Sequence, residues 1–191
     1  MKIGVLSVQG AVSEHIRHLE LCGTEAVAVK DSETIKQVSG LIIPGGESTT
    51  IGKLIEIFGL ADLIRKRNRE GSLAVFGTCA GMILIARDIT DGIQGQQRLG
   101  LMDIAVKRNA FGRQRESFET ELDFETFETP LTAVFIRAPI IEATGSGVVT
   151  LAKLPEGIVA ARQGNLLATS FHPELTTDLR VHRYFVQMCR V

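Results

Sequence analysis

Apolar runs alternate with segments of helical periodicity over the first half of this chain. Lys2 to Val8 is an apolar run typical of a buried strand, and Val12, Ile16 and Leu19 then recur at the spacing of one helix face. The alternation continues through three further apolar runs, with helical segments near Ile35, Leu54 and Leu63; the runs are Ala26 to Val29, Leu41 to Ile43 and Leu73 to Phe76. We therefore predict a mostly parallel sheet with helices on both faces.

The pattern changes after about residue 98, where short strand-like runs follow one another. We expect these runs to add antiparallel strands to the same sheet or beside it. They are Asp103 to Lys107, Thr132 to Ile136, Val148 to Ala152, Ile158 to Ala161 and Leu166 to Ser170. The chain closes with a predicted helix from about Leu179, whose inner side carries Val181, Tyr184, Phe185 and Met188.

Length and composition favour one compact domain over residues 1–191. With 191 residues, 45% of them hydrophobic, the chain can bury one substantial core but is short for two domains. A formal net charge of −1 argues against a nucleic-acid surface, and we interpret the basic run 65–69 as the exposed face of one helix. Met1 leads straight into a strand and no run is long enough to span a membrane, so we expect neither a signal peptide nor a membrane contact.

Cysteines and histidines are sparse. Cys22, Cys79 and Cys189 are too few and too scattered for a disulfide framework or a metal site, and they suit a reducing cytoplasm. His15 and His18 lie three apart on a predicted helix, but no cysteine or acidic residue is placed to complete a metal site. We interpret both as polar helix residues and expect no metal. Residues 91–97 are polar with two glycines, which predicts an exposed loop.

One short motif indicates covalent chemistry. The apolar run that ends at Phe76 leads into Gly77-Thr78-Cys79-Ala80-Gly81 and then into a helical stretch, Met82 to Ala86, which is the order of a nucleophile elbow. Side chains two residues before and after the nucleophile would collide in so tight a turn, so the geometry needs both glycines. Cys79 then lies at a helix N-terminus, where the helix dipole favours the reactive thiolate. The alternative is a small buried cysteine between two glycines.

A second motif supplies a base and an orienting group. The run Leu166 to Ser170 ends in Phe171-His172-Pro173-Glu174, so an imidazole and a carboxylate follow a predicted strand. If His172 and Glu174 are strand-like, they face the same side, and Glu174 can fix the tautomer of His172 while the other ring nitrogen faces the thiol. The alternatives are a structural histidine in a turn and a solvated acid. Both become improbable once Cys79 is taken into account.

A third motif offers donors for an oxyanion. The strand Leu41 to Ile43 is followed by Pro44-Gly45-Gly46-Glu47-Ser48-Thr49-Thr50, a turn whose glycine N–H groups can be aimed without steric conflict. The Gly46 and Ala80 N–H groups together are candidates for an oxyanion hole. The alternative is an ordinary strand-to-helix turn with Ser48 or Thr49 as N-cap.

Taken in this order, the motifs resemble the class I, triad-type glutamine amidotransferases, and more closely the glutaminase subunits of pyridoxal 5'-phosphate synthase. Two further segments carry the closer resemblance, Arg108-Asn109-Ala110-Phe111-Gly112-Arg113-Gln114 and Val134-Phe135-Ile136-Arg137-Ala138-Pro139. Ala110 departs from the pattern, which more often has serine there. The resemblance implies a three-layer, flavodoxin-like α/β fold with a mostly parallel central sheet and added antiparallel strands.

The resemblance also implies hydrolysis of L-glutamine to glutamate and ammonia, with the ammonia passed to a separate pyridoxal 5'-phosphate synthase subunit and no cofactor. Cys79, His172 and Glu174 form the implied catalytic triad. The resemblance maps recognition of glutamine to Gly46, Glu47, Ser48, Arg108, Ile136 and Arg137. An arginine suits a carboxylate because it binds both oxygens, although a solvated surface charge is the usual role of an arginine.

Three rival interpretations stay open on the sequence. The chain can be the glutaminase of another two-component amidotransferase, such as imidazole glycerol phosphate synthase, which would share the triad and differ in its partner. It can be a cysteine peptidase or thiol hydrolase on a related fold, or an inactive regulatory subunit. We also hypothesise that the turn at Gly45 and Gly46 is misaligned until the synthase binds, and that Gln9 and Gly10 lie at that contact.

Overall fold

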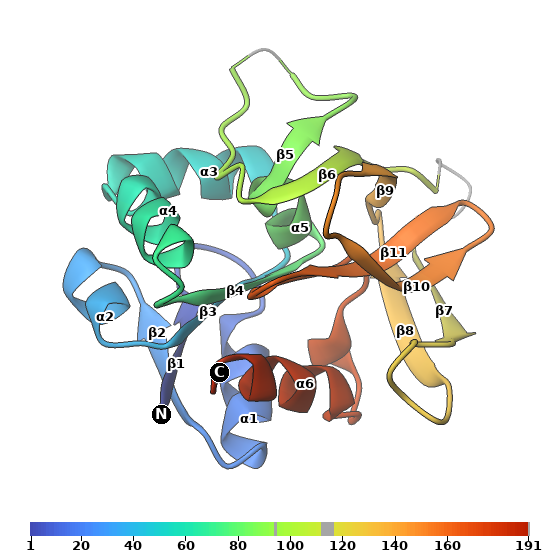
Figure 1. Cartoon of the computed structure of the whole chain (residues 1–191), viewed down its shortest axis with the longest axis horizontal. Helices are drawn as coiled ribbons and strands as arrows, with labels where there is room; N and C mark the ends of the chain where they lie inside the picture. Colours follow the sequence, from blue (N-terminus) through green and yellow to red (C-terminus); the bar gives the residue numbers. More distant parts are fainter. Residues whose placement is uncertain (94, 112–116, 191) are drawn as a thin grey trace.

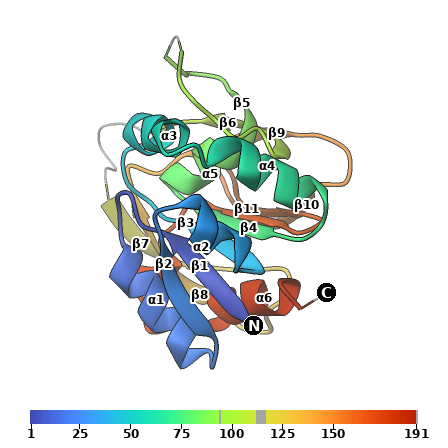
Figure 2. The ribbon, with the colours of Figure 1, turned by 90° about the vertical axis from the view of Figure 1, so that its left-hand side faces the viewer.

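The computed structural model describes residues 1–93, 95–111 and 117–190. A curled sheet divides the molecule into layers, with α3, α4 and α5 on one side and α1 and α6 on the other (Figures 1 and 2). The predicted fold class, a three-layer α/β fold with a mostly parallel sheet and added antiparallel strands, is confirmed. Among the described residues, no helix is long and apolar enough to cross a membrane.

The first half of the chain builds the parallel part of the sheet. Its strands are β1 (Lys2–Leu6), β2 (Glu25–Val29), β3 (Gly40–Ile43) and β4 (Ala74–Thr78). Between them lie the helices α1 (Val12–Leu21), α2 (Ser32–Lys36), α3 (Ser48–Ile57) and α4 (Ala61–Arg69), and α5 (Ala80–Ile85) follows β4. The predicted strand Lys2 to Val8 ends two residues early, at Leu6, and the predicted helix Met82 to Ala86 ends at Ile85 because Ala86 begins a strand.

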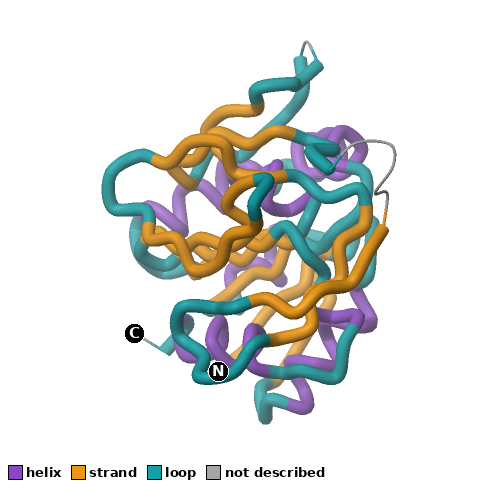
Figure 3. Tube along the Cα trace, turned by 90° about the vertical axis from the view of Figure 1, so that its right-hand side faces the viewer, coloured by secondary structure: helices purple, strands orange, loops and turns teal. Residues whose placement is uncertain are grey.

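The second half adds mainly antiparallel strands, as predicted. They are β5 (Ala86–Ile89), β6 (Met102–Lys107), β7 (Ser117–Leu122), β8 (Leu131–Ile136), β9 (Ile140–Thr144), β10 (Val149–Leu154), β11 (Gly157–Gln163) and β12 (Leu166–Thr169), followed by a 3-10 turn η1 (Pro173–Leu175) and the helix α6 (Arg180–Met188). Strands β7 and β8 form a separate two-stranded sheet. Strands and loops make up most of the side that Figure 3 faces. The sequence analysis did not specify β5, β7 and β9.

The order of the strands determines where loops gather. The main sheet runs β2-β1-β3-β4-β12-β11-β9-β6-β5, and β1, β3, β4 and β12 are parallel neighbours. Their carboxyl ends therefore meet at one edge. Loops that follow neighbouring parallel strands form the usual ligand-binding crevice of open α/β sheets. The three motifs that the sequence analysis selected all follow these strands.

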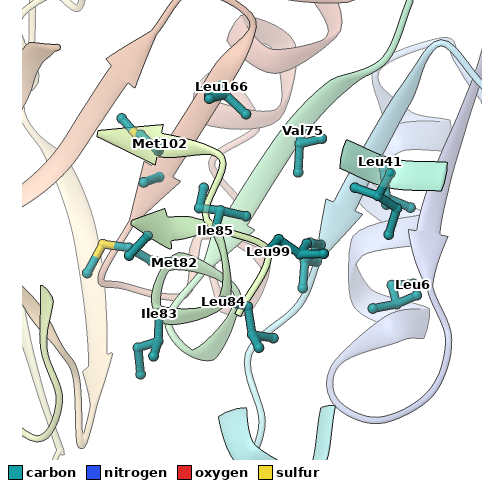
Figure 4. Close-up of a cluster of buried hydrophobic side chains, with 14 of the residues drawn as sticks. Leu6, Leu41, Val75, Met82, Ile83, Leu84, Ile85, Leu99, Met102 and Leu166 are labelled. Carbon is teal, nitrogen blue, oxygen red and sulfur yellow. The ribbon is translucent and has the colours of Figure 1, made fainter. Parts of the chain in front are cut away.

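The core has two parts, one on each face of the sheet. In β3, Leu41 and Ile43 pack with the apolar residues of α3, α4 and α5, whereas Ile42 between them packs with α1 and α6. This alternation follows from the two-residue period of a strand. Figure 4 shows the first part, in which Val75 of β4 and Leu84 of α5 are among the labelled side chains. Both faces of the central strands are buried, which explains their continuous apolar runs.

The histidines of α1 lie in a helix, as predicted, but they are buried. His15 is fully buried and His18 is 6% exposed, so neither is an ordinary polar residue on the solvent face of a helix. Both contact His182 of α6, which is also fully buried. A side chain from a helix more than 160 residues away in sequence supplies the hydrogen bonds that let these rings be buried, and helical periodicity carries no information on such a partner.

Because of this cluster of histidines, we predict that the folded chain loses stability in mild acid. Burial lowers the pKa of His182 to about 3 and holds the pKa of His15 well below 6.5. The unfolded chain therefore takes up protons below pH 6.5 that the folded chain does not. The free energy of unfolding should fall by about 1.4 kcal/mol per pH unit for each such histidine as pH drops from 6.5 toward 3.

Urea unfolding at pH 7.5, 6.5 and 5.5 measures this slope. We expect His182→Leu to have a shallower slope than the wild type, because it removes a group whose pKa is strongly lowered in the folded chain. His15 loses a neighbour that helps to lower its own pKa, which makes the slope shallower still, whereas titrating groups outside the histidine cluster contribute equally to both proteins and cancel. Equal slopes for the two proteins would contradict the prediction.

Candidate active site

Cys79 lies at the turn between β4 and α5 in a conformation rare for a side-chain-bearing residue. Its φ is 48° and its ψ is −104°, and Cys79 is 8% exposed. A Cβ added to Gly77 would lie 2.7 Å from the Met82 nitrogen, and one added to Gly81 would lie 2.9 Å from the Ile43 carbonyl carbon. Both positions therefore need glycine, as the predicted elbow requires. The nucleophile-elbow geometry is present.

His172 and Glu174 follow β12, and they are hydrogen-bonded. The distance from His172 Nδ1 to Glu174 Oε1 is 2.7 Å, and the Glu174 side chain is fully buried. The two residues are not strand-like as predicted, because His172 precedes the 3-10 turn η1 and Glu174 lies within it. Pro173 at the start of η1 cannot continue a strand ladder, so the tight turn brings the carboxylate back to the ring.

The electrostatics favour a protonated His172. Burial lowers the pKa of His172, but hydrogen bonds to Cys79 and Glu174 and the charges of both groups outweigh burial and raise it to about 10. Nδ1 is taken by Glu174, which leaves Nε2 for the thiol. The raised pKa of His172 leaves its Nε2 able to hold a proton beside the sulfur of Cys79.

The loop after β3 closes against these groups. A Cβ on Gly45 would collide with His172 Cε1, and it would lie 3.1 Å from His172 Nδ1 and 3.4 Å from Cys79 Cβ. The Glu47 N–H donates to Gln9 Oε1 at 3.0 Å, so the loop after β1 supports the loop after β3. Gly45 is therefore the contact point between this loop and the reactive groups.

Glu47, and neither Ser48 nor Thr49, caps helix α3. Its carboxylate accepts from the backbone N–H of Thr49 at 3.2 Å and of Thr50 at 2.7 Å. Burial raises the pKa of Glu47, but the hydrogen bonds from Thr49 and Thr50 outweigh it and lower the pKa to about 2. The sequence analysis named Ser48 or Thr49 as the N-cap, and both were wrong. Glu47, one position before Ser48, accepts the hydrogen bonds from the first backbone N–H groups of the helix.

One pocket of about 410 Å³ is lined by Cys79, His172, Glu174 and Gly45 together. Every residue that the sequence analysis selected lines it: Gly46, Glu47, Ser48, Cys79, Ala80, Arg108, Ile136, Arg137, His172 and Glu174. The structure adds Ala11, Gly45, Ile83, Asn109 and Leu175 to the lining. Residues 112–114 of the Arg108 to Gln114 segment lie outside the described residues.

Backbone strain marks the same pocket. Over the described ranges, three residues other than glycine have a positive φ: Cys79 at 48°, Asn109 at 38° and Arg137 at 43°. All three line the pocket. Such conformations are unfavourable for residues with a Cβ and concentrate at functional sites. Asparagine adopts this conformation more readily than most residues, so the type of Asn109 is compatible with it, whereas the type of Arg137 gives no signal.

Gln96 is a contact that the sequence analysis missed. It lies in the predicted loop 91–97, where residue 94 is not described. Its Nε2 donates to Ser48 Oγ at 3.2 Å, and its Oε1 accepts from Arg108 Nη1 at 3.1 Å. Gln96 therefore connects two predicted binding residues, Ser48 at the start of α3 and Arg108 directly after β6. Within residues 1–93, 95–111 and 117–190, no group of three or more His, Cys, Asp or Glu side chains could hold a metal ion.

Comparison with known proteins identifies the family. The sequence model of the SNO glutamine amidotransferase family matches residues 5–191. The chain belongs to the SNO glutamine amidotransferase family. Two relatives named pyridoxal 5'-phosphate synthase subunit PdxT are similar over nearly their whole length. The one from Niallia circulans is 57% identical over 100% of this chain and 98% of its own, and the one from Pelotomaculum thermopropionicum is 58% identical over 99% and 95%.

Solved structures agree with this assignment. A crystal structure of a glutamine amidotransferase has a TM-score of 0.94 and 51% identity, and the match covers 99% of both chains. The structure of PurLQS from Thermotoga maritima has a TM-score of 0.67 at 18% identity and covers 99% of this chain and 97% of its own, which shows a shared fold alone. The SNO glutamine amidotransferase described here therefore has the elbow, the His172–Glu174 pair and the pocket in an amidotransferase fold.

Proposed function

We propose that this chain hydrolyses the side-chain amide of L-glutamine and delivers the ammonia to a pyridoxal 5'-phosphate synthase subunit. The observation that carries this proposal is the 2.7 Å hydrogen bond between His172 and Glu174, with Cys79 beside His172 in the lining of the same pocket. The named relatives are subunits of pyridoxal 5'-phosphate synthase. The chemistry requires a free thiol, so we expect the reaction in a reducing compartment, the cytoplasm.

In the first half-reaction, the Cys79 thiolate attacks the amide carbon and forms a carbon–sulfur bond. The negative charge moves to the amide oxygen, where the N–H groups of Gly46 and Ala80 are the proposed donors. His172 gives its proton to the departing nitrogen, and ammonia leaves as the carbon–nitrogen bond breaks. Glutamate remains attached to Cys79 as a thioester, and His172 is neutral.

In the second half-reaction, neutral His172 removes a proton from water. The resulting hydroxide adds to the thioester carbon, and the carbon–sulfur bond breaks to release glutamate. Cys79 returns as a thiolate and His172 as an imidazolium. Glu174 stays ionised and stabilises the imidazolium in both steps through the 2.7 Å bond to Nδ1.

The charges at the mouth of the pocket suit the amino-acid end of glutamine. Arg108 and Arg137 are cations for the α-carboxylate, whereas Glu47 is an anion for the α-ammonium group. Arg108 is held by Gln96 at 3.1 Å and lies 4.0 Å from Glu47, so its head group is positioned before substrate binds. Ser48 and the backbone near Ile136 complete the proposed recognition site.

Replacing Arg108 with glutamine should weaken binding more than chemistry. Loss of a charge-assisted contact to the α-carboxylate should raise KM for glutamine about 10- to 100-fold, with kcat reduced much less. Steady-state kinetics with glutamine measures both constants, and Arg87→Gln, which lies outside the pocket, is the matched control. An unchanged KM would contradict the proposed role of Arg108.

Glutamate release by the purified chain, alone and with a pyridoxal 5'-phosphate synthase subunit, tests the proposed function. We expect release that depends on Cys79 and rises when the synthase is added. The rise is expected because Gln9 Oε1 holds the Glu47 N–H at 3.0 Å, which links the loop after β1 to the proposed oxyanion loop. A synthase that contacts Gln9 can then align Gly45 and Gly46.

Equal rates with and without the synthase would contradict this activation and point to another partner. No release under either condition would contradict the glutaminase itself.

A further inference from the structure

The second carboxylate oxygen of Glu174 faces a histidine that the mechanism does not use. Oε1 is bonded to His172, and Oε2 lies 3.4 Å from Nε2 of His15 in α1. Both side chains have no exposed surface. In the described part of the chain no group gives Oε2 a well-aligned hydrogen bond. A buried carboxylate oxygen without a donor is unfavourable, so the His15 N–H is the group placed to satisfy it.

His15 is itself part of a line of three rings. His15 Nδ1 lies 2.9 Å from His182 Nε2, and His182 Nδ1 lies 3.2 Å from His18 Nδ1. Thr78 Oγ1 lies 3.4 Å from His15 Nε2, on the same side as Glu174. The rings pack edge to face or tilted, with centroids 5.2 Å apart for His15 and His182 and 4.6 Å for His18 and His182.

The carboxylate sets the proton position on every ring in this line. A carboxylate only accepts hydrogen bonds, so His15 must carry its proton on Nε2 and accept at Nδ1. His182 must then donate from Nε2 and accept at Nδ1, and His18 must donate from Nδ1. Burial lowers the pKa of all three, which keeps His15 and His182 neutral, each with one donor and one acceptor.

We propose that His15 is a positioning residue of the glutaminase site, which acts through Glu174. Its Nε2–H holds Oε2, so that Oε1 stays on His172 Nδ1, and His182 and His18 fix the His15 tautomer. This inference rests on the proposed function only in those tests that measure glutaminase activity. Two helices distant in sequence build the line, since His15 and His18 belong to α1, and His182 of α6 is 167 residues from His15.

The kinetic test compares two substitutions in the complex with the synthase. His15→Leu keeps an apolar body without an N–H, whereas His15→Gln places an amide donor near the position of Nε2. We expect His15→Leu to lower kcat about 10- to 100-fold with little change in KM, and His15→Gln to recover most of the loss. Equal loss in both variants, or no loss in either, would overturn the proposal.

The pH profile separates positioning from simple packing. The titratable groups around Glu174 are His172 on its own loop, His15 and His18 of α1, and His182 of α6 behind them. In His15→Leu, Glu174 is held less firmly on His172, so the pKa of His172, which this contact helps to raise to about 10, should fall and the limb of the kcat profile that reports His172 should move to lower pH. A packing defect alone would leave the limb in place.

A second measurement needs neither a variant nor activity. The chain has four histidines, so their ring-nitrogen NMR signals in the wild-type protein are few enough to assign. We expect His15 and His182 as neutral Nε2–H tautomers at pH 7. A proton on His15 Nδ1 would overturn the proposal. If the wild type shows the expected tautomers but hydrolyses no glutamine, the proposed function fails and the positioning of Glu174 stands.

Discussion

Replacing Cys79 with alanine should lower glutamine hydrolysis by about 10⁴-fold or more, because the carbon–sulfur bond of the thioester cannot form. Cys79 is small and 8% exposed, and besides its contact with His172 its Sγ lies 3.8 Å from the Ile136 carbonyl oxygen. Loss of the thiol should therefore change folding little. Glutamate release in the presence of the synthase measures activity, and urea unfolding measures stability.

Cys189→Ala is the matched control for this variant. Burial raises the pKa of the Cys189 thiol to about 12, so this cysteine stays a thiol, and it lies at the end of α6 outside the pocket. We expect its activity to stay within a few-fold of the wild type. Two results would show that Cys79 is not the nucleophile. One is Cys79→Ala activity that exceeds the uncatalysed rate by a large factor, and the other is an equal loss of activity in Cys189→Ala.

Replacing Gly45 with alanine should lower kcat about 100-fold without removing any reacting group. The new methyl group would collide with His172 Cε1 and crowd Nδ1 at 3.1 Å, so the ring must move away from Cys79 or Glu174. A displacement of about 1 Å at reacting groups can cost about 10²-fold in rate. Single-turnover measurement of thioester formation reports the chemical step directly.

Gly164→Ala is the control for Gly45→Ala. Gly164 has a φ of 57° in the turn between β11 and β12, and a Cβ there meets no atom within 4 Å. Its substitution should cost about 1 kcal/mol of stability through backbone strain and leave kcat unchanged. A Gly45→Ala enzyme with normal kcat would contradict the close packing of Gly45 against His172.

Much of the fold and site could be predicted because local residue types determine them. Gly77 and Gly81 are required by contacts within one turn, and the continuous apolar runs of the parallel strands reflect burial on both faces. Each predicted motif follows a strand. Parallel neighbours bring those ends to one edge, which gathers the residues that follow β3, β4 and β12 into one pocket, whereas Arg108, Ile136 and Arg137 were assigned to it only by the family resemblance.

What could not be predicted depends on contacts distant in sequence or on backbone conformation. Helical spacing predicted His15 only as a polar helix residue. The burial of its ring depends on contacts with His182 and Glu174, which are distant in the sequence. The link from Gln96 to Ser48 crosses 48 residues. The strained φ of Arg137 has no signature in its residue type. Glu174 lies in a 3-10 turn that starts at Pro173, and this turn, which the sequence analysis did not predict, brings its carboxylate to His172 in place of strand-like spacing.

Covalent labelling tests the central claim, that Cys79 attacks the amide of glutamine, most directly. The reagent is a glutamine analogue with an electrophilic diazoketone in place of the amide, applied to the complex with the synthase and followed by peptide mass spectrometry. We predict one adduct, on Cys79, formed more slowly when glutamine is present, with Cys22 and Cys189 unmodified. Adducts on another residue, or labelling of Cys79 that glutamine does not slow, would contradict the account.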